Sequence, residues 1–158
     1  MNENAEPLIN RIIEWQRGEY LLSTDKEKID IAVVHNYLFN DSYWAEGIPI
    51  EIVKKSIENS LCFGFYHEKA LVGFARIISD FATFAYLADV FVLPAHRKKG
   101  LSKWLMETIM SYEDLQGLRR FLLTTLDAHG LYEQYGFELY PQPERMMAIN
   151  VQGAYKKK

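Results

Sequence analysis

The sequence contains a single cysteine. Cys62 stands in an apolar stretch, and without a second thiol the chain cannot form an internal disulfide. Disulfide bridges belong to oxidising compartments, whereas one thiol in an apolar setting fits a reducing one. The cysteine count therefore predicts a cytoplasmic protein with a buried, structural thiol.

Long hydrophobic runs and signal-like segments are missing as well. The longest apolar stretch, FATFAYLADVFVLPA, contains Asp89, reaches a proline and is too short to cross a bilayer as a helix. The first ten residues, MNENAEPLIN, hold two acidic residues and no basic segment, unlike a secretory signal. We expect a soluble protein with no membrane partner.

Positive charge is not in excess. The chain has 18 basic and 21 acidic residues, a formal net charge of −3 at pH 7, which argues against a general nucleic-acid binder. It also has no internal repeat and no low-complexity linker. Any basic patch must therefore be local.

Apolar side chains are plentiful enough for a folded core. Of the 158 residues, 49% are hydrophobic and 14% are aromatic, which excludes a disordered chain. A chain of this length buries a substantial core as one unit. We expect a single domain over residues 1–158.

The first third of the chain predicts a strand and two helices. Residues 19–23 form a short strand, and residues 24–39 form a helix that opens with a capping box between Thr24 and Glu27. A second helix covers residues 48–59 and starts at a proline. Its apolar face is formed by Ile52, Val53 and Ile57.

The middle of the chain predicts three strands. Residues 60–67 and 70–79 are apolar runs separated by Glu68 and Lys69, a pattern typical of a hairpin. Residues 83–93 are almost continuously apolar, as expected for a strand covered on both faces.

The last third of the chain again predicts alternating helices and strands. A helix is expected over residues 102–110, a buried strand over 119–126 and a short helix over 129–135. Two final strands are expected over residues 136–140 and 145–150. This order indicates an α/β domain with a central mixed sheet flanked by helices.

Three adjacent cations precede Gly100 at the start of the third long helix. The helix dipole already makes that end positive, so Arg97, Lys98 and Lys99 are poorly placed for stability unless an anion binds there. The first helical N–H groups lack intrahelical partners, and a glycine lets a ligand approach the backbone. The stretch predicts a pyrophosphate site, although it lacks the spacing of a P-loop or a GxGxxG turn. The alternative is a solvated charged loop.

The stretch VLPAHRKKGLS resembles the central motif of the GNAT superfamily of acyl-CoA-dependent N-acyltransferases. Four of its positions match that motif and one departs from it: Val92, Pro94, Arg97 and Gly100 match, and Ser102 replaces the usual Gly or Ala. GLYEQYGF, residues 130–137, resembles a second signature, in which a helix tyrosine precedes Gly-Phe. The resemblance covers residues 19–150 and implies a single GNAT-like domain with that core. Residues 1–18 would be an N-terminal extension and residues 154–158 a basic tail.

The resemblance implies acetyl-CoA as co-substrate and assigns contacts with it. These contacts fall on eight residues: Phe91, Val92, Arg97, Lys98, Lys99, Gly100, Leu101 and Ser102. The backbone amides from Lys98 to Ser102 would bind the pyrophosphate. The backbone of Phe91 and Val92 would pair with the pantetheine arm, and one N–H there would stabilise the developing oxyanion.

Tyr132 matches the tyrosine that serves as general acid in this family. A phenol with a pKa of ~10 is protonated at neutral pH and can give its proton to the coenzyme A thiolate. The alternative role is an aromatic that packs the short helix onto the sheet.

The general base is less clearly marked. Asp89, on the central strand, is the first candidate, because some relatives carry an acid there. Asp80 is the second, and Asp127 and His129 are further alternatives. A cap or turn role competes for each of them.

Tyr43 and Trp44 are the candidate acceptor-binding residues. Asp41 and Glu46 stand beside them, so a cationic amine could bind by cation–π and ionic contacts. The alternative is an aromatic anchor for a loop. The histidines lack metal-ligand spacing, and we predict no metal.

The resulting prediction is an acetyl-CoA-dependent N-acetyltransferase that acetylates a primary amine of a small molecule by direct attack in a ternary complex. Alternatives are a protein-lysine acetyltransferase, a non-catalytic acyl-CoA-binding module and a nucleotide-phosphate-binding regulator. Expected partners are the amine or a protein lysine, no nucleic acid, and a second copy in a homodimer.

Overall fold

The computed structural model describes residues 6–156, and its centre is a six-stranded sheet in the order β1-β2-β3-β4-β5-β6. The strands are β1 Glu14–Arg17, β2 Tyr20–Ser23, β3 Leu61–His67, β4 Ala70–Ser79, β5 Phe84–Val92 and β6 Arg120–Leu123. All neighbours pair antiparallel except β5 and β6, which pair parallel. The predicted α/β fold with a mixed sheet is confirmed.

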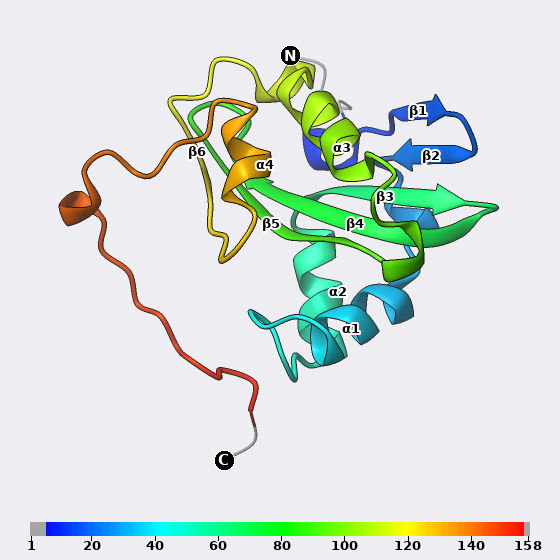
Figure 1. The fold of residues 1–158 in the computed structure, drawn as a ribbon, viewed down its shortest axis with the longest axis horizontal. Helices are drawn as coiled ribbons and strands as arrows, with labels where there is room; N and C mark the ends of the chain where they lie inside the picture. Colours follow the sequence, from blue (N-terminus) through cyan, green and yellow to red (C-terminus); the bar gives the residue numbers. More distant parts are fainter. Residues whose placement is uncertain (1–5, 157–158) are drawn as a thin grey trace.

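Helices cover both faces of this sheet (Figure 1). Helices α1 (Ile31–Asn40) and α2 (Ile50–Glu58) pack on one face, and α3 (Leu101–Met110) and α4 (His129–Glu133) pack on the other. Each face has its own apolar cluster: one centres on Phe63, Phe65 and the buried side of α3, the other on Phe74 and the buried sides of α1 and α2. Among residues 6–156, no helix is long and apolar enough to cross a membrane.

Short 3₁₀ turns complete the path: η1 Leu8–Asn10, η2 Lys26–Lys28, η3 Pro94–His96, η4 Glu113–Leu115 and η5 Pro143–Arg145. The helix expected over residues 24–39 begins only at Ile31, because Asp30 caps it through the amides of Ala32 and Val33. The Thr24–Glu27 capping box is therefore wrong. The Thr24 hydroxyl instead bonds the backbone of Ile13.

Helix α2 and the β3–β4 hairpin agree with the sequence. Pro49 is the N-cap of α2, and Val53 and Ile57 are buried, although Ile52 is exposed. Glu68 and Lys69 both take positive φ angles, 48° and 69°, which suits a tight hairpin turn.

The sheet begins earlier than expected. Residues 14–17, within the predicted N-terminal extension, form β1 and pair with β2 from Glu14↔Ser23 to Arg17↔Tyr20. Trp15 packs against the buried Phe63, which explains why this polar stretch is ordered. Residues 1–5 of that extension and residues 157–158 of the basic tail lie outside the described residues.

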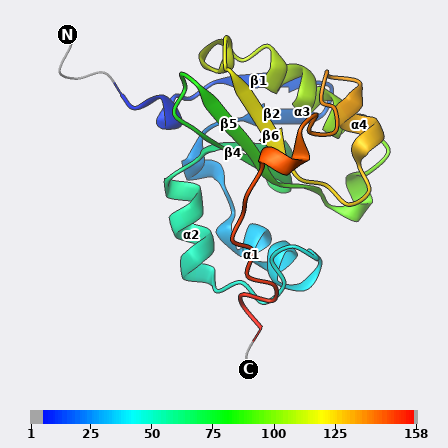
Figure 2. The same ribbon diagram turned by 90° about the vertical axis from the view of Figure 1, so that its left-hand side faces the viewer.

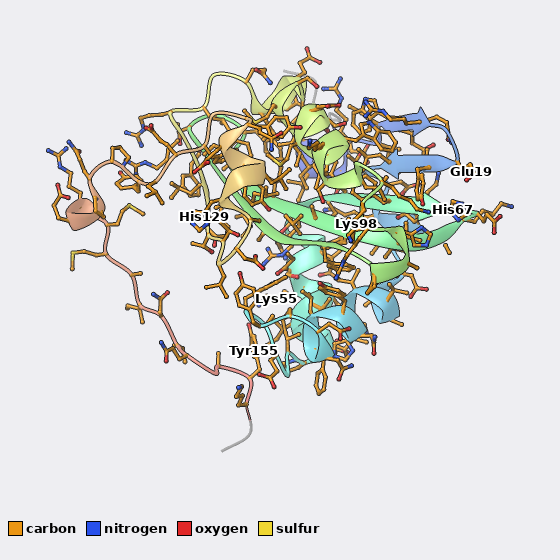
Figure 3. All side chains as sticks on the ribbon, in the orientation of Figure 1. Glu19, Lys55, His67, Lys98, His129 and Tyr155 are labelled. Carbon is orange, nitrogen blue, oxygen red and sulfur yellow. The ribbon has the colours of Figure 1, made fainter. Side chains whose placement is uncertain are left out.

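The two strands expected after α4 are absent from the described structure. Residues 137–156 run as an extended chain past the β6 edge, from the layer of α4 to the layer of α1 (Figures 1 and 2). Pro141 and Pro143 interrupt any pairing ladder, because proline lacks an N–H donor. The chain is fixed again near Tyr155, which Figure 3 places beside the α1–α2 loop.

Candidate active site

The strands β5 and β6 separate at one end. Their pairing runs from Phe84↔Arg120 to Leu87↔Leu123 and stops there, although β5 continues to Val92. The predicted strand over residues 119–126 is therefore shorter in the structure. The last residues of β5 have no sheet partner on that side among the described residues.

A β-bulge shapes this free end of β5. The register places Phe74 opposite Phe91 and Arg76 opposite Ala88, so Asp89 and Val90 both face Ala75. Asp89 takes a φ of 55°, a left-handed conformation that is uncommon for residues other than glycine. The bulge turns the strand and directs the Asp89 side chain out of the sheet.

The backbone of Val92 faces the gap left by β6. Leu93 donates its N–H to the Val72 carbonyl at 2.8 Å, so the polar groups of Val92 point to the opposite edge by antiparallel alternation. The Val92 carbonyl accepts a bond from Arg97 Nε at 2.9 Å. The Val92 N–H is the donor that this geometry presents to the gap.

The Arg97 guanidinium is held by hydrogen bonds to other residues of the chain. Besides Val92, its guanidinium donates to the Tyr37 hydroxyl at 3.2 Å, and the Tyr37 ring stacks on Phe91 with centroids 4.0 Å apart. Arg97 therefore positions the loop between β5 and α3 and keeps the strand end in place.

The loop after Arg97 turns through left-handed residues into α3. Lys98 has a φ of 62° and Gly100, the N-cap of α3, a φ of 76°. A Cβ added at Gly100 would meet no atom within 4 Å, so the space over this backbone is open. A cavity of about 240 Å³ lies here, lined by residues of the loop, by Val92 and by Leu131.

The other predicted loop residues have different positions. Leu101 is the first residue of α3 and lines the cavity, but its side chain is largely buried, so mainly its backbone can face a ligand. Ser102 lines the cavity with Lys98. Lys99 points to the β1–β2 hairpin, where its Nζ lies 5.9 Å from the centre of the Tyr20 ring.

A second cavity, of about 570 Å³, lies where β5 and β6 separate. It brings together three segments that are far apart in the sequence, through the neighbours Tyr43 and Trp44, Asp89 and Tyr132. Tyr43 accepts a bond from the Leu126 amide at 3.1 Å, so the α1–α2 loop is tied to the segment after β6. Val90 lines this cavity and Val92 lines the smaller one, so the two adjoin along β5.

The carboxylate of Asp89 is held on both oxygens. One oxygen accepts from Arg76 Nε at 2.5 Å and the other from Trp44 Nε1 at 2.9 Å. The side chains of Asp89 and Arg76 are only 9% and 18% exposed, so this is a largely buried ion pair. Arg76 also donates to Ser60 at 3.2 Å. The contacts join the bulge to β4 and, through Trp44, to the α1–α2 loop.

Tyr132 lies in α4 and is 8% exposed, with its ring edge-to-face against Phe137. Burial raises the pKa of Tyr132, and Tyr43 and Asp127 raise this pKa further. Both effects oppose the phenolate, so the hydroxyl keeps its proton at neutral pH. Tyr132 is thus a protonated phenol in the wall of the larger cavity.

Asp80 does not reach either cavity. Its carboxylate accepts from the amides of Ala82, Thr83 and Phe84 in the turn before β5, at the end where β5 and β6 are paired. These bonds, chiefly from Thr83, hold the pKa of Asp80 far below its usual range. Asp80 is therefore a turn residue that lines neither cavity.

The two remaining acid–base candidates, Asp127 and His129, lie at different sites. Asp127 lines the larger cavity beside Tyr132, whereas His129 lines a groove on the outer side of β6. Figure 3 shows His129 in α4 and Lys98 on the loop before α3, well apart. Among residues 6–156, no group of three or more His, Cys, Asp or Glu is arranged to hold a metal ion.

Sequence reasoning missed Arg76 and the bulge. Arg76 interrupts an apolar strand, and a lone cation in a buried run is a signal for a buried acidic partner. The bulge has no such signal, because Asp89 is not a glycine.

Comparisons with known proteins agree with this geometry. The chain matches the model of the acetyltransferase (GNAT) family over residues 9–137. A Gibberella zeae protein assigned as an acetyltransferase is 30% identical over 160 residues, which cover 87% of this chain and 89% of that protein.

Solved structures share the fold. A protein of Xanthomonas campestris pv. campestris, assigned to the acetyltransferases of the GNAT family, is 49% identical with a TM-score of 0.87, over 90% of this chain and 100% of that one. A Clostridium acetobutylicum protein, described as a predicted acetyltransferase and crystallised with acetyl-CoA, has a TM-score of 0.63 at 13% identity. That match covers 83% of this chain and 94% of the other.

Proposed function

Because the chain belongs to the GNAT family of acetyltransferases, we propose that it transfers the acetyl group of acetyl-CoA to a primary amine of a small molecule. One observation carries the proposal: the free end of β5 presents the Val92 N–H between two adjoining cavities, and Tyr132 lines the larger one. Acetyl-CoA supplies an activated thioester. The chain must hold it, stabilise developing negative charge and return a proton to the thiolate.

The smaller cavity fits the diphosphate of the co-substrate. Gly100 leaves the backbone uncovered, and the first amides of α3 lack intrahelical partners. Lys98 adds a cation at the cavity wall, while Arg97 holds the loop in shape. An extended pantetheine arm would then pair with the unpaired edge of β5 at Phe91 and Val92, as an added strand does.

The Val92 N–H is the proposed donor to the acetyl carbonyl oxygen. Removing one preorganised side-chain donor to an oxyanion costs about 2.7–4 kcal/mol where it has been measured, and the fixed Val92 N–H would act in the same way. Tyr132, kept protonated by its surroundings, is the proposed general acid toward the departing thiolate.

The larger cavity is the proposed acceptor site. Its volume of about 570 Å³ lies in the range of small-molecule pockets and favours a free amine over a folded protein surface. Tyr43, Trp44 and Tyr86 supply aromatic faces for a cation. Attack would be direct, in a ternary complex, because the two cavities adjoin.

Asp127 is the proposed carboxylate for the incoming amine. Of the carboxylates that line the larger cavity among the described residues, it is the one without an ion-pair partner. Asp89 lines the same cavity, but both of its oxygens are engaged. We therefore propose that Asp89 positions the α1–α2 loop through Trp44, and that the amine loses its proton through Asp127 or an ordered water.

The buried Cys62 fits a reducing compartment, and we propose a cytoplasmic location for the enzyme. Protein lysine remains the second acceptor class. A non-catalytic acyl-CoA-binding module is the alternative from another class, and it predicts binding without turnover.

The test is release of the coenzyme A thiol from acetyl-CoA across a panel of small amines and lysine peptides. We expect turnover with at least one small amine. Tyr132→Phe should then lower kcat by about 10²–10⁴-fold with little change in acetyl-CoA affinity, because general acid catalysis acts in the transition state. No turnover with any acceptor, despite acetyl-CoA binding, would favour the binding module. Wild-type turnover in Tyr132→Phe would return that side chain to a packing role.

A further inference from the structure

Three side-chain rings pack together beside the loop that precedes α3. Tyr20 from β2, His67 from β3 and His96 from η3 have ring centroids between 5.1 and 5.7 Å apart. None of the proposed catalytic steps uses these rings. Because His96 also lines the smaller cavity, this ring cluster borders the proposed co-substrate site.

The contact with Tyr20 leaves one nitrogen of His96 for a ligand. The Tyr20 hydroxyl lies 2.8 Å from His96 Nδ1, whereas Nε2 has no hydrogen-bond partner among residues 6–156. A hydroxyl can donate or accept, so Tyr20 accommodates the imidazole in its neutral and in its protonated form. His96 can therefore offer the Nε2–H to a ligand in both forms.

Unpaired cations surround the ring cluster. Lys98 and Lys99 precede α3 and Lys103 lies in its first turn, and in the described part of the chain none of the three forms a salt bridge. By contrast, Arg17 on the neighbouring hairpin is paired with Glu107 at 3.1 Å. Cations at a helix N-terminus oppose the helix dipole, so this unpaired charge favours a bound anion.

Lys99 brings an ammonium group to the same cluster as His96. Its Nζ lies 5.9 Å from the centre of the Tyr20 ring. The carboxylate of Glu19 lies 3.5 Å from His67 Nε2 and is 85% exposed, and Figure 3 shows both residues at the hairpin end of the sheet. Glu19 therefore pairs with His67 and leaves Lys99 and His96 as two donors without an anionic partner.

Coenzyme A carries a phosphate monoester on its ribose in addition to its diphosphate. We propose that Lys99 Nζ and His96 Nε2 bind this phosphate monoester of acetyl-CoA, with Tyr20 and His67 packed behind the imidazole. The inference rests on the proposed function, because it takes acetyl-CoA as the co-substrate. The diphosphate would lie beside Gly100, and the phosphate monoester, with a charge of about −1.5 to −2 at pH 7, would neutralise the unpaired cations.

Calorimetric titration with acetyl-CoA and with acetyl-dephospho-CoA, which lacks only the ribose phosphate, tests the site. We expect the wild type to bind acetyl-CoA about tenfold or more tightly, because hydrogen bonds between charged groups are lost with that phosphate. Lys99→Met should remove most of this preference and leave the affinity for acetyl-dephospho-CoA unchanged. Lys98→Met, the matched control at the proposed diphosphate site, should weaken binding of both ligands equally.

Two kinds of result separate this site from the proposed function. Equal affinities of the wild type for the two ligands, or a preference that survives Lys99→Met, overturn the phosphate monoester site while leaving acetyl-CoA as co-substrate. Binding of neither ligand would contradict the proposed function itself, and this site with it.

Proton uptake on binding tests the part assigned to His96. Partial burial, together with His67 and Lys99, lowers the pKa of His96 in the free protein. A phosphate at Nε2 would raise this pKa again, so acetyl-CoA binding should take up protons and strengthen as the pH falls from about 7.5 to about 6.5.

Titrations in two buffers with different heats of ionisation count these protons. With acetyl-CoA, His96→Gln should take up fewer protons than the wild type, whereas with acetyl-dephospho-CoA the two proteins should agree. Equal proton uptake by the wild type and His96→Gln with acetyl-CoA would overturn the assignment of His96 to the site.

Discussion

At the scale of single residues, Asp89 has the most consequential surroundings. It lies at a left-handed bulge position, pairs with Arg76 and accepts from Trp44, so one side chain joins two strands and a loop. Motif residues such as Gly100 could be predicted from the sequence because their role is local. The pairing of Asp89 with Arg76 could not, because it depends on the register of β4 and β5.

The variant Asp89→Asn distinguishes a role in positioning the α1–α2 loop from a role as general base. The variant keeps an acceptor for Trp44 but leaves the Arg76 guanidinium without its charged partner. We expect a loss of about 3 kcal/mol in the free energy of unfolding, the lower end for a broken buried pair. Urea denaturation measures it, and Asp41→Asn, on an exposed carboxylate outside the cavity, is the control. Unchanged stability with a lost acidic limb in the pH profile of kcat/KM would instead make Asp89 the base.

At the scale of elements, the loop before α3 and its glycine form the proposed co-substrate site. Gly100 and Gly117 form a matched pair: their φ angles are 76° and 72°, and a Cβ at either would meet no atom within 4 Å. Only Gly100 lies at the proposed diphosphate site.

Valine at either glycine should therefore strain the backbone similarly, by about 1–2 kcal/mol. Gly100→Val should in addition weaken acetyl-CoA binding by tenfold or more, because its side chain fills the space over the α3 amides. Calorimetric titration of both folded variants measures this. Equal affinities for Gly100→Val and Gly117→Val would remove the diphosphate from this loop.

The same loop is tied to the β1–β2 hairpin through His96. The Tyr20 hydroxyl lies 2.8 Å from His96 Nδ1, and Lys99 lies over the Tyr20 ring. The His67 ring, which also contacts Glu19, lies tilted against the His96 ring with centroids 5.3 Å apart. Partial burial lowers the pKa of His96, as do His67 and Lys99. The unfolded chain therefore takes up this proton at a higher pH than the folded chain does.

The stability linked to neutral His96 is complete above its ordinary pKa of ~6.5 and is lost as the pH falls below that value. Melting temperatures of the wild type should accordingly drop more steeply below this pH than those of His96→Gln. His129→Gln, on α4, is the control and should follow the wild type. Parallel curves for the wild type and His96→Gln would show that this contact does not respond to pH.

The prediction of strands from the sequence failed where the structure depends on which strands pair with one another. Residues 145–150 have the composition of a strand, yet in the described structure they pair with nothing, because two prolines and the Tyr155 contact direct the chain past β6. Residues 14–17 are polar and were expected to lie outside the core, yet they pair with β2 and are covered by the packing of Trp15.

At the scale of the whole molecule, the separation of β5 from β6 creates the candidate site. The order of elements could be predicted from apolar runs and the two motifs. The gap could not, since it depends on where a parallel pairing stops. That gap places an unpaired strand edge between the two cavities. In the proposed co-substrate site the pantetheine arm of acetyl-CoA would pair with this edge, whereas a plain nucleotide phosphate has no such arm.

Hydrogen exchange of backbone amides tests this account most directly. Acetyl-CoA should slow exchange both in the α3 loop, residues 98–102, and at the free end of β5, including the Val92 amide. ATP, which has phosphates but no pantetheine arm, should slow exchange in the loop alone. Protection confined to the loop with both ligands, or absent from both segments with acetyl-CoA, would contradict the proposed co-substrate site.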